Sequence, residues 1–219
     1  MSVIASTSYE ILINEEYHIL NTYIDKLYPS KIIIIVDENT EEHCLPKIKK
    51  NIHHDFLSIK IPSGEKYKTL STCQGLWQAL IQNACDRETL IINLGGGVIG
   101  DMGGFVAGTY MRGVKFIQIP TTLLAQVDAS VGGKLAIDHM AYKNIIGLFL
   151  EPTMVWVDTS FLDTLPDTQV RSGYAEVVKH ALIRSKALWN KVTTKDLSYI
   201  NSSEWASLIE DNILSLIHI

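Results

Sequence analysis

The sequence has few cysteines and lacks both a long apolar run and a strong charge of one sign. Its three cysteines, Cys44, Cys73 and Cys85, are an odd number without C-x-x-C spacing. This argues against a disulfide framework or zinc knuckle, and we expect reduced thiols. The net charge of −5 argues against an electrostatic nucleic-acid binder. The apolar stretch Ile32–Val36 is far shorter than the roughly 20 residues that span a bilayer, so we expect no membrane association.

The N-terminal sequence MSVIASTSYE lacks the basic segment and apolar core of a signal peptide. We therefore expect a cytoplasmic location. Hydrophobic residues make up 47% of the chain and charged residues 20%, which excludes a disordered or low-complexity protein and supplies a sizeable core. At about 150 residues per domain, the 219 residues correspond to about one and a half domains.

Short apolar runs alternate with helical patterns over residues 32–157. Ile32–Val36 is β-branched and fully apolar, which is typical of a strand buried on both faces of a parallel sheet. The alternation predicts an α/β fold with a Rossmann-like, doubly wound parallel sheet, which binds ligands outside the carboxyl ends of its strands. The predicted strands are 32–36, 56–61, 89–94, 114–119 and 154–157, and the predicted helices between them are 40–51, 69–84 and 98–111.

The pattern changes near Pro166. Residues 170–185 and 203–219 are both typical of helices, and no strand is evident after Met154–Val157. We therefore expect an α/β domain over residues 1–166, followed by the beginning of a helical domain over residues 167–219.

Gly95–Gly100 matches G-x-G-x-x-G between a predicted strand and a predicted helix. Such glycines let a pyrophosphate approach backbone N–H groups at a helix N-terminus, although a glycine turn can also serve packing alone. A Rossmann site also needs an acid at the end of the following strand, but that strand ends in Pro120-Thr121-Thr122. Asp37, after the first of these strands, is the candidate for holding a ribose. Asp101 either complements the helix dipole or hydrogen-bonds a nicotinamide or substrate group, and both roles remain open.

Several longer motifs around this turn resemble the 3-dehydroquinate synthase family. They occur in the family's order, between about residues 32 and 183. Two positions depart from the family pattern: Tyr142 stands where many relatives have glycine, and Glu151 where glutamine is common. The motifs are Gly64–Lys68, Gly95–Gly113, Ile119–Thr122, Gln126–Lys134, Lys143–Gly147 and Gly173–His180.

The resemblance implies a phosphorus–oxygen lyase of the shikimate pathway that depends on NAD and a divalent metal. The family converts 3-deoxy-arabino-heptulosonate 7-phosphate to 3-dehydroquinate with loss of phosphate. NAD oxidises a ring hydroxyl transiently and is not consumed. The resemblance also implies a homodimer.

Site residues follow from the same motifs, position by position. The resemblance implies that Arg112, Asp128, Lys134, Asn144 and Lys179 act on the substrate, and it leaves open that Arg112 does so across a dimer interface. Lysines suit a phosphorylated, carboxylated sugar acid because they are compact point charges. With Asp37 added from the strand argument, the expected NAD site comprises Asp37, Ser63, Gly64, Glu65, Lys66, Tyr67, Lys68, Gly97, Val98, Ile99, Gly100, Asp101, Thr121, Thr122, Lys134, Lys143, Phe161, Leu162, Asp163 and Thr164.

Glu176 is implied as a ligand for zinc or cobalt. It lies three residues before Lys179 and four before His180, so these side chains share a helix face, although a surface ion pair explains the same spacing. A catalytic zinc usually has three protein ligands. The family supplies two histidines for this from beyond the position of Ile219. His180 is not at a family ligand position, and His218 fits no ligand motif.

The mostly apolar residues 212–219 lack a polar helix end, so we expect the chain to be the N-terminal part of a longer enzyme. Such a chain would bind NAD without turnover. The alternatives are another sugar-phosphate cyclase, a glycerol-type dehydrogenase on the same scaffold, or a non-catalytic NAD-binding domain.

Overall fold

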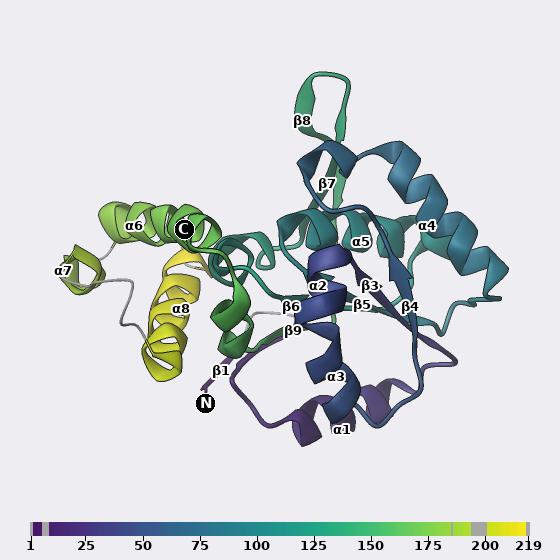
Figure 1. The fold of residues 1–219 in the computed structure, drawn as a ribbon, viewed down its shortest axis with the longest axis horizontal. Helices are drawn as coiled ribbons and strands as arrows, with labels where there is room; N and C mark the ends of the chain where they lie inside the picture. Colours follow the sequence, from purple (N-terminus) through teal and green to yellow (C-terminus); the bar gives the residue numbers. More distant parts are fainter. Residues whose placement is uncertain (1, 6–8, 185, 194–200, 218–219) are drawn as a thin grey trace.

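A seven-stranded sheet forms the centre of the computed structural model, which describes residues 2–5, 9–184, 186–193 and 201–217. All neighbouring strands are parallel except β1 and β2. The strands β7 and β8 pair separately as an antiparallel hairpin whose tip projects from the main body (Figure 1). Across the main sheet the order is β1 (Ser2–Ala5), β2 (Glu10–Ile13), β9 (Met154–Val157), β6 (Phe116–Pro120), β5 (Leu90–Gly95), β3 (Ile32–Val36) and β4 (Leu57–Lys60), and the hairpin comprises β7 (Lys134–His139) and β8 (Tyr142–Phe149).

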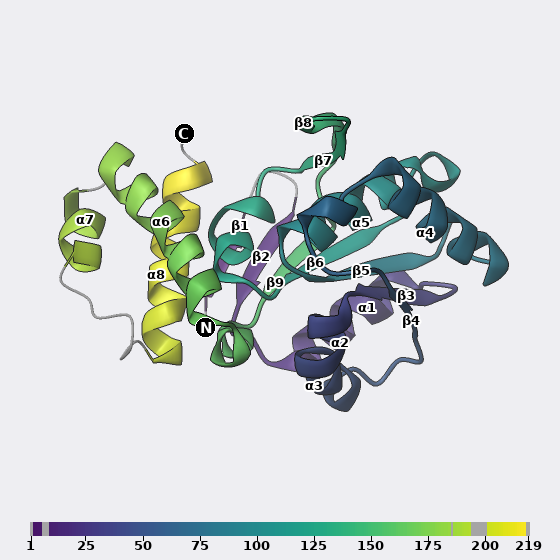
Figure 2. The ribbon, with the colours of Figure 1, turned by 45° about the horizontal axis from the view of Figure 1, so that its top comes forward.

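Helices cover both faces of the sheet, as Figure 2 shows. Side chains alternate between the two faces of a strand, so Ile33 and Ile35 of β3 pack in one hydrophobic cluster while Ile34 packs in the other. The doubly wound α/β prediction is therefore confirmed. One face carries α4 (Leu70–Gln82) and α5 (Gly97–Thr109), and the other carries α1 (Tyr17–Leu27), α2 (Glu38–His43) and α3 (Leu45–Asn51).

Three helices gather beside the β1 end of the sheet (Figure 1): α6 (Asp167–Arg184), α7 (Lys186–Thr193) and α8 (Ser202–Ile217). The α6 helix begins directly after Pro166, and in the described part of the chain no strand follows β9. Val177 and Ile209 share one hydrophobic cluster with Ile11 and Val155 of the sheet. The helices and strands thus have a common core, and a domain division between residues 166 and 167 stays a prediction.

Several local features differ from the sequence expectations. The helix expected over residues 40–51 is two short helices that meet at Cys44, because Pro46, in the first turn of α3, favours the start of a new helix. The β1 and β2 strands, α1 and the β7–β8 hairpin were not predicted. None of the helices described here is long and apolar enough to cross a bilayer.

Candidate functional site

A cavity of about 500 Å³ lies between α5, the hairpin and one turn of π-helix, η3 (Ala125–Ala129). It brings together four predicted site residues that are far apart in the sequence. Asp101 comes from the first turns of α5, Asp128 from η3, and Lys134 and Asn144 from the hairpin strands. The lining residues are Asp101, Asp128, Ala129, Val131, Lys134, Leu135, Ala136, Asn144, Gly147, Leu148 and Phe149.

The ammonium group of Lys68 lies buried beside this cavity. Lys68 Nζ donates to the carboxylate of Asp101 and to Asn144 Oδ1, the latter at 2.6 Å. The backbone N–H of Asn144 donates to Asp138 Oδ1 at 2.8 Å, which ties β8 to β7 where the Asn144 side chain begins. Burial raises the pKa of the Asp101 carboxyl to about 6, against the opposing effect of the Lys68 ammonium. Asp101 is thus more than a helix-dipole partner, because it pairs with a buried cation at the cavity wall.

The glycine turn lets the neighbouring Thr122 side chain lie close to its backbone. None of the glycines in the turn has a positive φ. A Cβ on Gly96 would lie 3.0 Å from Cγ2 of Thr122. Thr121 N donates to Gly95 O at 3.0 Å, which ties the end of β6 to the end of β5. The turn, the first N–H groups of α5 and the predicted residues Thr121 and Thr122 therefore meet at the carboxyl edge of the sheet, where an anion is favoured.

Farther along this edge, other predicted NAD residues already have protein partners. One oxygen of Asp37 accepts from Thr40 N at 2.9 Å and completes a capping box at the start of α2. Ser63 Oγ accepts from Asn39 Nδ2, and Lys143 pairs with Glu65 at 3.2 Å. The contact of Asp37 with a ribose stays a prediction.

Not every predicted residue reaches the cavity. Phe161 and Leu162 are buried in the hydrophobic clusters, whereas Asp163 and Thr164 are exposed after β9. Arg112 is exposed beyond the C-terminal end of α5, a helix about 20 Å long whose other end faces the cavity.

A candidate metal-binding group adjoins the cavity. Ligand atoms of Asp128, Glu176 and His180 all lie within 4.8 Å of one another. His180 Nε2 is 3.1 Å from Glu176 Oε1, which also pairs with Lys179. Among the described residues, the buried His180 Nδ1 has no hydrogen-bond partner. Two carboxylates and an imidazole suit a zinc-type divalent ion, so these residues fit a metal.

The approach of α6 to η3 depends on Gly173. A Cβ there would lie 2.5 Å from the backbone nitrogen of Leu124. One helical turn later, Glu176 faces Asp128. The sequence analysis assigned no ligand role to His180 and no role to Gly173. Both roles depend on contact between α6 and η3, which are about 50 residues apart in the sequence.

The family model described as 3-dehydroquinate synthase N-terminal matches residues 58–172. The chain belongs to this family. A 3-dehydroquinate synthase from Bacillus cytotoxicus is 45% identical over 200 residues, which cover 86% of this chain and 53% of the relative. One from Nitrosospira multiformis is 47% identical over 170 residues, which cover 76% of this chain and 46% of the relative. The chain thus spans about half the length of the 3-dehydroquinate synthases it matches.

The family fold is also found in solved structures. A 2-deoxy-scyllo-inosose synthase complexed with carbaglucose-6-phosphate, NAD+ and Co2+ superposes with a TM-score of 0.84 at 25% identity, over 100% of this chain and 62% of that chain. The resemblance stated from the sequence motifs is confirmed at the level of family and fold.

Proposed function

We propose that this chain forms the NAD-binding part, and some of the substrate-binding part, of a 3-dehydroquinate synthase. Such an enzyme converts 3-deoxy-arabino-heptulosonate 7-phosphate to 3-dehydroquinate and phosphate. The observation that carries the proposal is the cavity, because it unites Asp101, Asp128, Lys134 and Asn144 beside the glycine turn. The related 2-deoxy-scyllo-inosose synthase, which was solved with NAD+, supports the choice of cofactor.

Each part of the proposed NAD site has a role that follows from its chemistry. The N-terminus of α5 and the Thr121–Thr122 segment hold the pyrophosphate of NAD, and Asp37 holds a ribose. The buried pair of Lys68 and Asp101 orients the nicotinamide end beside Asn144.

Two lysines, Asp128 of η3 and Asn144 of the hairpin are the proposed substrate-binding residues. Lys134, at the cavity wall, and the half-exposed Lys179 bind the phosphate and carboxylate groups. Asp128 accepts hydrogen bonds from the sugar hydroxyls, and the amide nitrogen of Asn144 donates to them.

Glu176 is the proposed metal ligand, with Asp128 and His180 beside it. A zinc or cobalt ion held there would act as a Lewis acid on the substrate hydroxyl that NAD oxidises. The protein residues in turn fix the position of that hydroxyl relative to the nicotinamide.

The proposed enzyme is a cytoplasmic homodimer. The cysteines Cys44, Cys73 and Cys85 are all free and buried, which agrees with a reducing compartment. The position of Arg112, exposed and at the far end of α5, supports a role toward the cavity of a second copy.

Calorimetric titration of the purified chain with NAD tests the cofactor site. We expect one NAD to bind per chain and Gly96→Val to weaken binding, because the added side chain would collide with Thr122. Gly75→Ala on α4 is the matched control, since a Cβ there has no neighbour within 4 Å. Absence of NAD binding, or equal weakening by both variants, would contradict the proposed site.

A chimera tests the reaction. Residues 1–219 are joined to the C-terminal half of the Bacillus cytotoxicus relative, and phosphate release and net NADH formation are measured with zinc present. We expect phosphate release from the heptulosonate substrate without net NADH, and no turnover by the 219-residue chain alone. Net NADH formation would favour a dehydrogenase, and activity only on another sugar phosphate would favour a different cyclase.

A further inference from the structure

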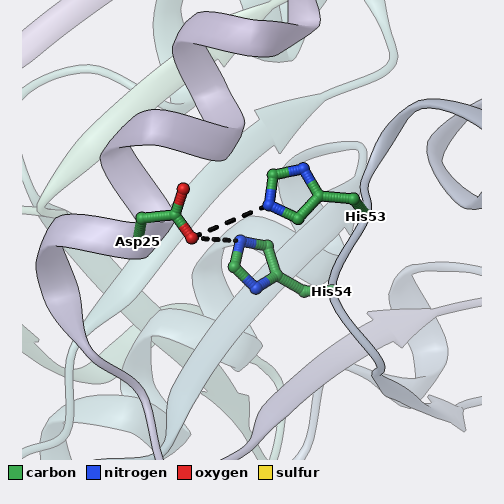
Figure 3. A group of neighbouring side chains, drawn as sticks. All are labelled: Asp25, His53 and His54. Atoms are coloured by element: carbon green, nitrogen blue, oxygen red, sulfur yellow. Dashed lines mark ion pairs between the residues drawn. The ribbon is translucent and has the colours of Figure 1, made fainter.

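A second group of metal-binding side chains lies outside the cavity. Asp25 projects from α1, and His53 and His54 come from the segment between α3 and β4 (Figure 3). None of the three lines the cavity, and none belongs to the family motifs. Their ligand atoms all lie within 4.8 Å of one another.

Both imidazoles point their ε-nitrogens toward the same carboxylate oxygen, as the dashed lines in Figure 3 show. His53 Nε2 lies 3.7 Å and His54 Nε2 lies 3.3 Å from Asp25 Oδ1. These separations exceed the usual 2.7–3.2 Å range of an N–H···O hydrogen bond. Ligands about 2.0–2.2 Å from one zinc ion, by contrast, are themselves about 3.3–3.6 Å apart in a tetrahedral arrangement. The two nitrogen–oxygen separations are thus closer to those between ligands of a shared ion than to those of hydrogen-bonded partners.

A buried amide fixes this arrangement. Asn21, one helical turn before Asp25 on α1, donates from Nδ2 to Asn51 O at 2.9 Å. Its Oδ1 accepts from the backbone N–H of His53 at 3.2 Å. Because residues four apart lie on the same face of a helix, this clamp holds the histidine segment over the face of α1 that carries Asp25. The folded chain therefore already holds the three ligands together, so an ion that binds there does not have to order them.

One imidazole nitrogen of this group lacks a protein hydrogen bond in the described part of the chain. His54 Nε2 is shielded from solvent, and it has no hydrogen-bond partner among the residues that the structure describes. A buried polar atom without a partner is unfavourable, and a bound ion would satisfy it. Asp25 and His54 also line an open hollow of about 440 Å³, which leaves room for water molecules to complete the coordination.

We propose that Asp25, His53 and His54 form a binding site for a zinc-type divalent transition-metal ion, separate from the NAD and substrate cavity. Two imidazole nitrogens with one carboxylate oxygen favour zinc, nickel or copper over calcium or magnesium, which prefer oxygen ligands. The ion cross-links α1 to the segment after α3.

Titration with ZnCl₂ tests this site. The Glu176→Gln chain is used as the starting protein, because that change removes the candidate ligand beside the cavity. We expect this chain to bind one Zn²⁺, and His54→Gln in the same background to weaken binding by more than about tenfold, since even changes behind a metal ligand cost 10- to 100-fold. Asp25→Asn and His53→Gln are expected to weaken binding similarly, and they keep the test valid if one variant fails to fold.

His18→Gln is the matched control. His18 is an exposed histidine 3.1 Å from a single carboxylate, that of Glu16, and it lies on the same helix as Asp25. We expect this change to leave Zn²⁺ affinity unaltered. Thermal unfolding gives an independent measure, because an ion that binds only the folded chain raises Tm. Zn²⁺ should raise the Tm of the Glu176→Gln chain and of its His18→Gln derivative, but not that of the His54→Gln derivative.

Three results would overturn the proposal. They are an absence of Zn²⁺ binding by the Glu176→Gln chain, unchanged affinity after His54→Gln, or an equal loss of affinity after His18→Gln. None of them bears on the NAD titration, so this site and the proposed enzymatic function are tested separately.

Discussion

The pairing of Lys68 with Asp101 shows how single residues set the electrostatics of the cavity. The ammonium group is almost fully buried, with 4% of the Lys68 side chain exposed, and it has two oxygen partners from distant segments. A buried cation is tolerated only when it is paired in this way. The same burial makes the Asp101 carboxylate costly to ionise, so its pKa rises in spite of its partner.

This shift predicts a pH dependence of stability that Asp101→Asn removes. The pKa of Asp101 is about 6 in the folded chain, against an ordinary value of 3.8, so the folded state binds this proton more tightly than the unfolded state does. The stabilising contribution is fully present below about pH 3.8 and is lost as the pH rises through 6. Relative to Asp101→Asn, we expect the unfolding free energy to fall by up to about 3 kcal/mol over this window.

Urea unfolding at several pH values measures this difference. Glu42→Gln, which changes an exposed carboxylate on α2, is the control and should follow the original chain. If the original chain and Asp101→Asn showed parallel pH profiles, the pKa of the Asp101 carboxyl would not be raised in the folded chain, and the prediction would be wrong.

At the scale of elements, the candidate metal ligands depend on how closely α6 approaches η3. A π-helical turn is uncommon and is frequently found at functional sites, and here it carries Asp128. The absence of a side chain at Gly173 lets α6 lie against Leu123 and Leu124, which brings Glu176 and His180 to the same place.

Two alanine substitutions should therefore have opposite effects on stability. A Cβ at Gly173 would meet the backbone nitrogen of Leu124, which cannot move aside cheaply, and the base of the Leu123 side chain, so we expect Gly173→Ala to destabilise by about 1–3 kcal/mol. Gly75→Ala places a Cβ in open space in the interior of α4 and should stabilise by about 0.5–1 kcal/mol. Chemical denaturation measures both changes, and a neutral Gly173→Ala would mean that the contact between α6 and η3 is loose.

At the scale of the whole molecule, the hairpin exposes several large apolar side chains. Met140 is 89%, Tyr142 67%, Ile145 60% and Phe149 86% exposed. Contiguous exposed apolar side chains are characteristic of protein–protein contacts. The hairpin also contributes to the cavity wall, so a partner at this surface would influence the site.

Sedimentation velocity tests the proposed homodimer. We expect a species of about twice 24.5 kDa, and a shift toward monomer when Met140→Ser and Ile145→Ser are combined. Ile81→Ser, which changes a 66% exposed side chain on α4, is the control and should leave the dimer intact. A monomeric original chain would contradict the proposal.

Local sequence patterns are enough to identify the α/β class, the central parallel strands and the family. Runs such as Ile32–Val36 are β-branched and apolar on both faces, which favours a buried strand. The glycine motif lies where the residues after a strand reach the ligand-binding edge. Both signals are local, so they could be recognised without knowledge of the tertiary contacts. The hairpin escaped prediction because Lys134–His139 and Tyr142–Phe149 carry no clear alternation of apolar and polar side chains.

Which distant residues come into contact depends on the tertiary packing. The contact between Lys68 and Asn144 joins segments 76 residues apart, and Asp128 meets His180 only because α6 packs on η3. The spacing of Asp25, His53 and His54 depends in the same way on the side chain of Asn21 between two helices. Such encounters are set by the packing of complete elements, and no local pattern of residue types encodes them.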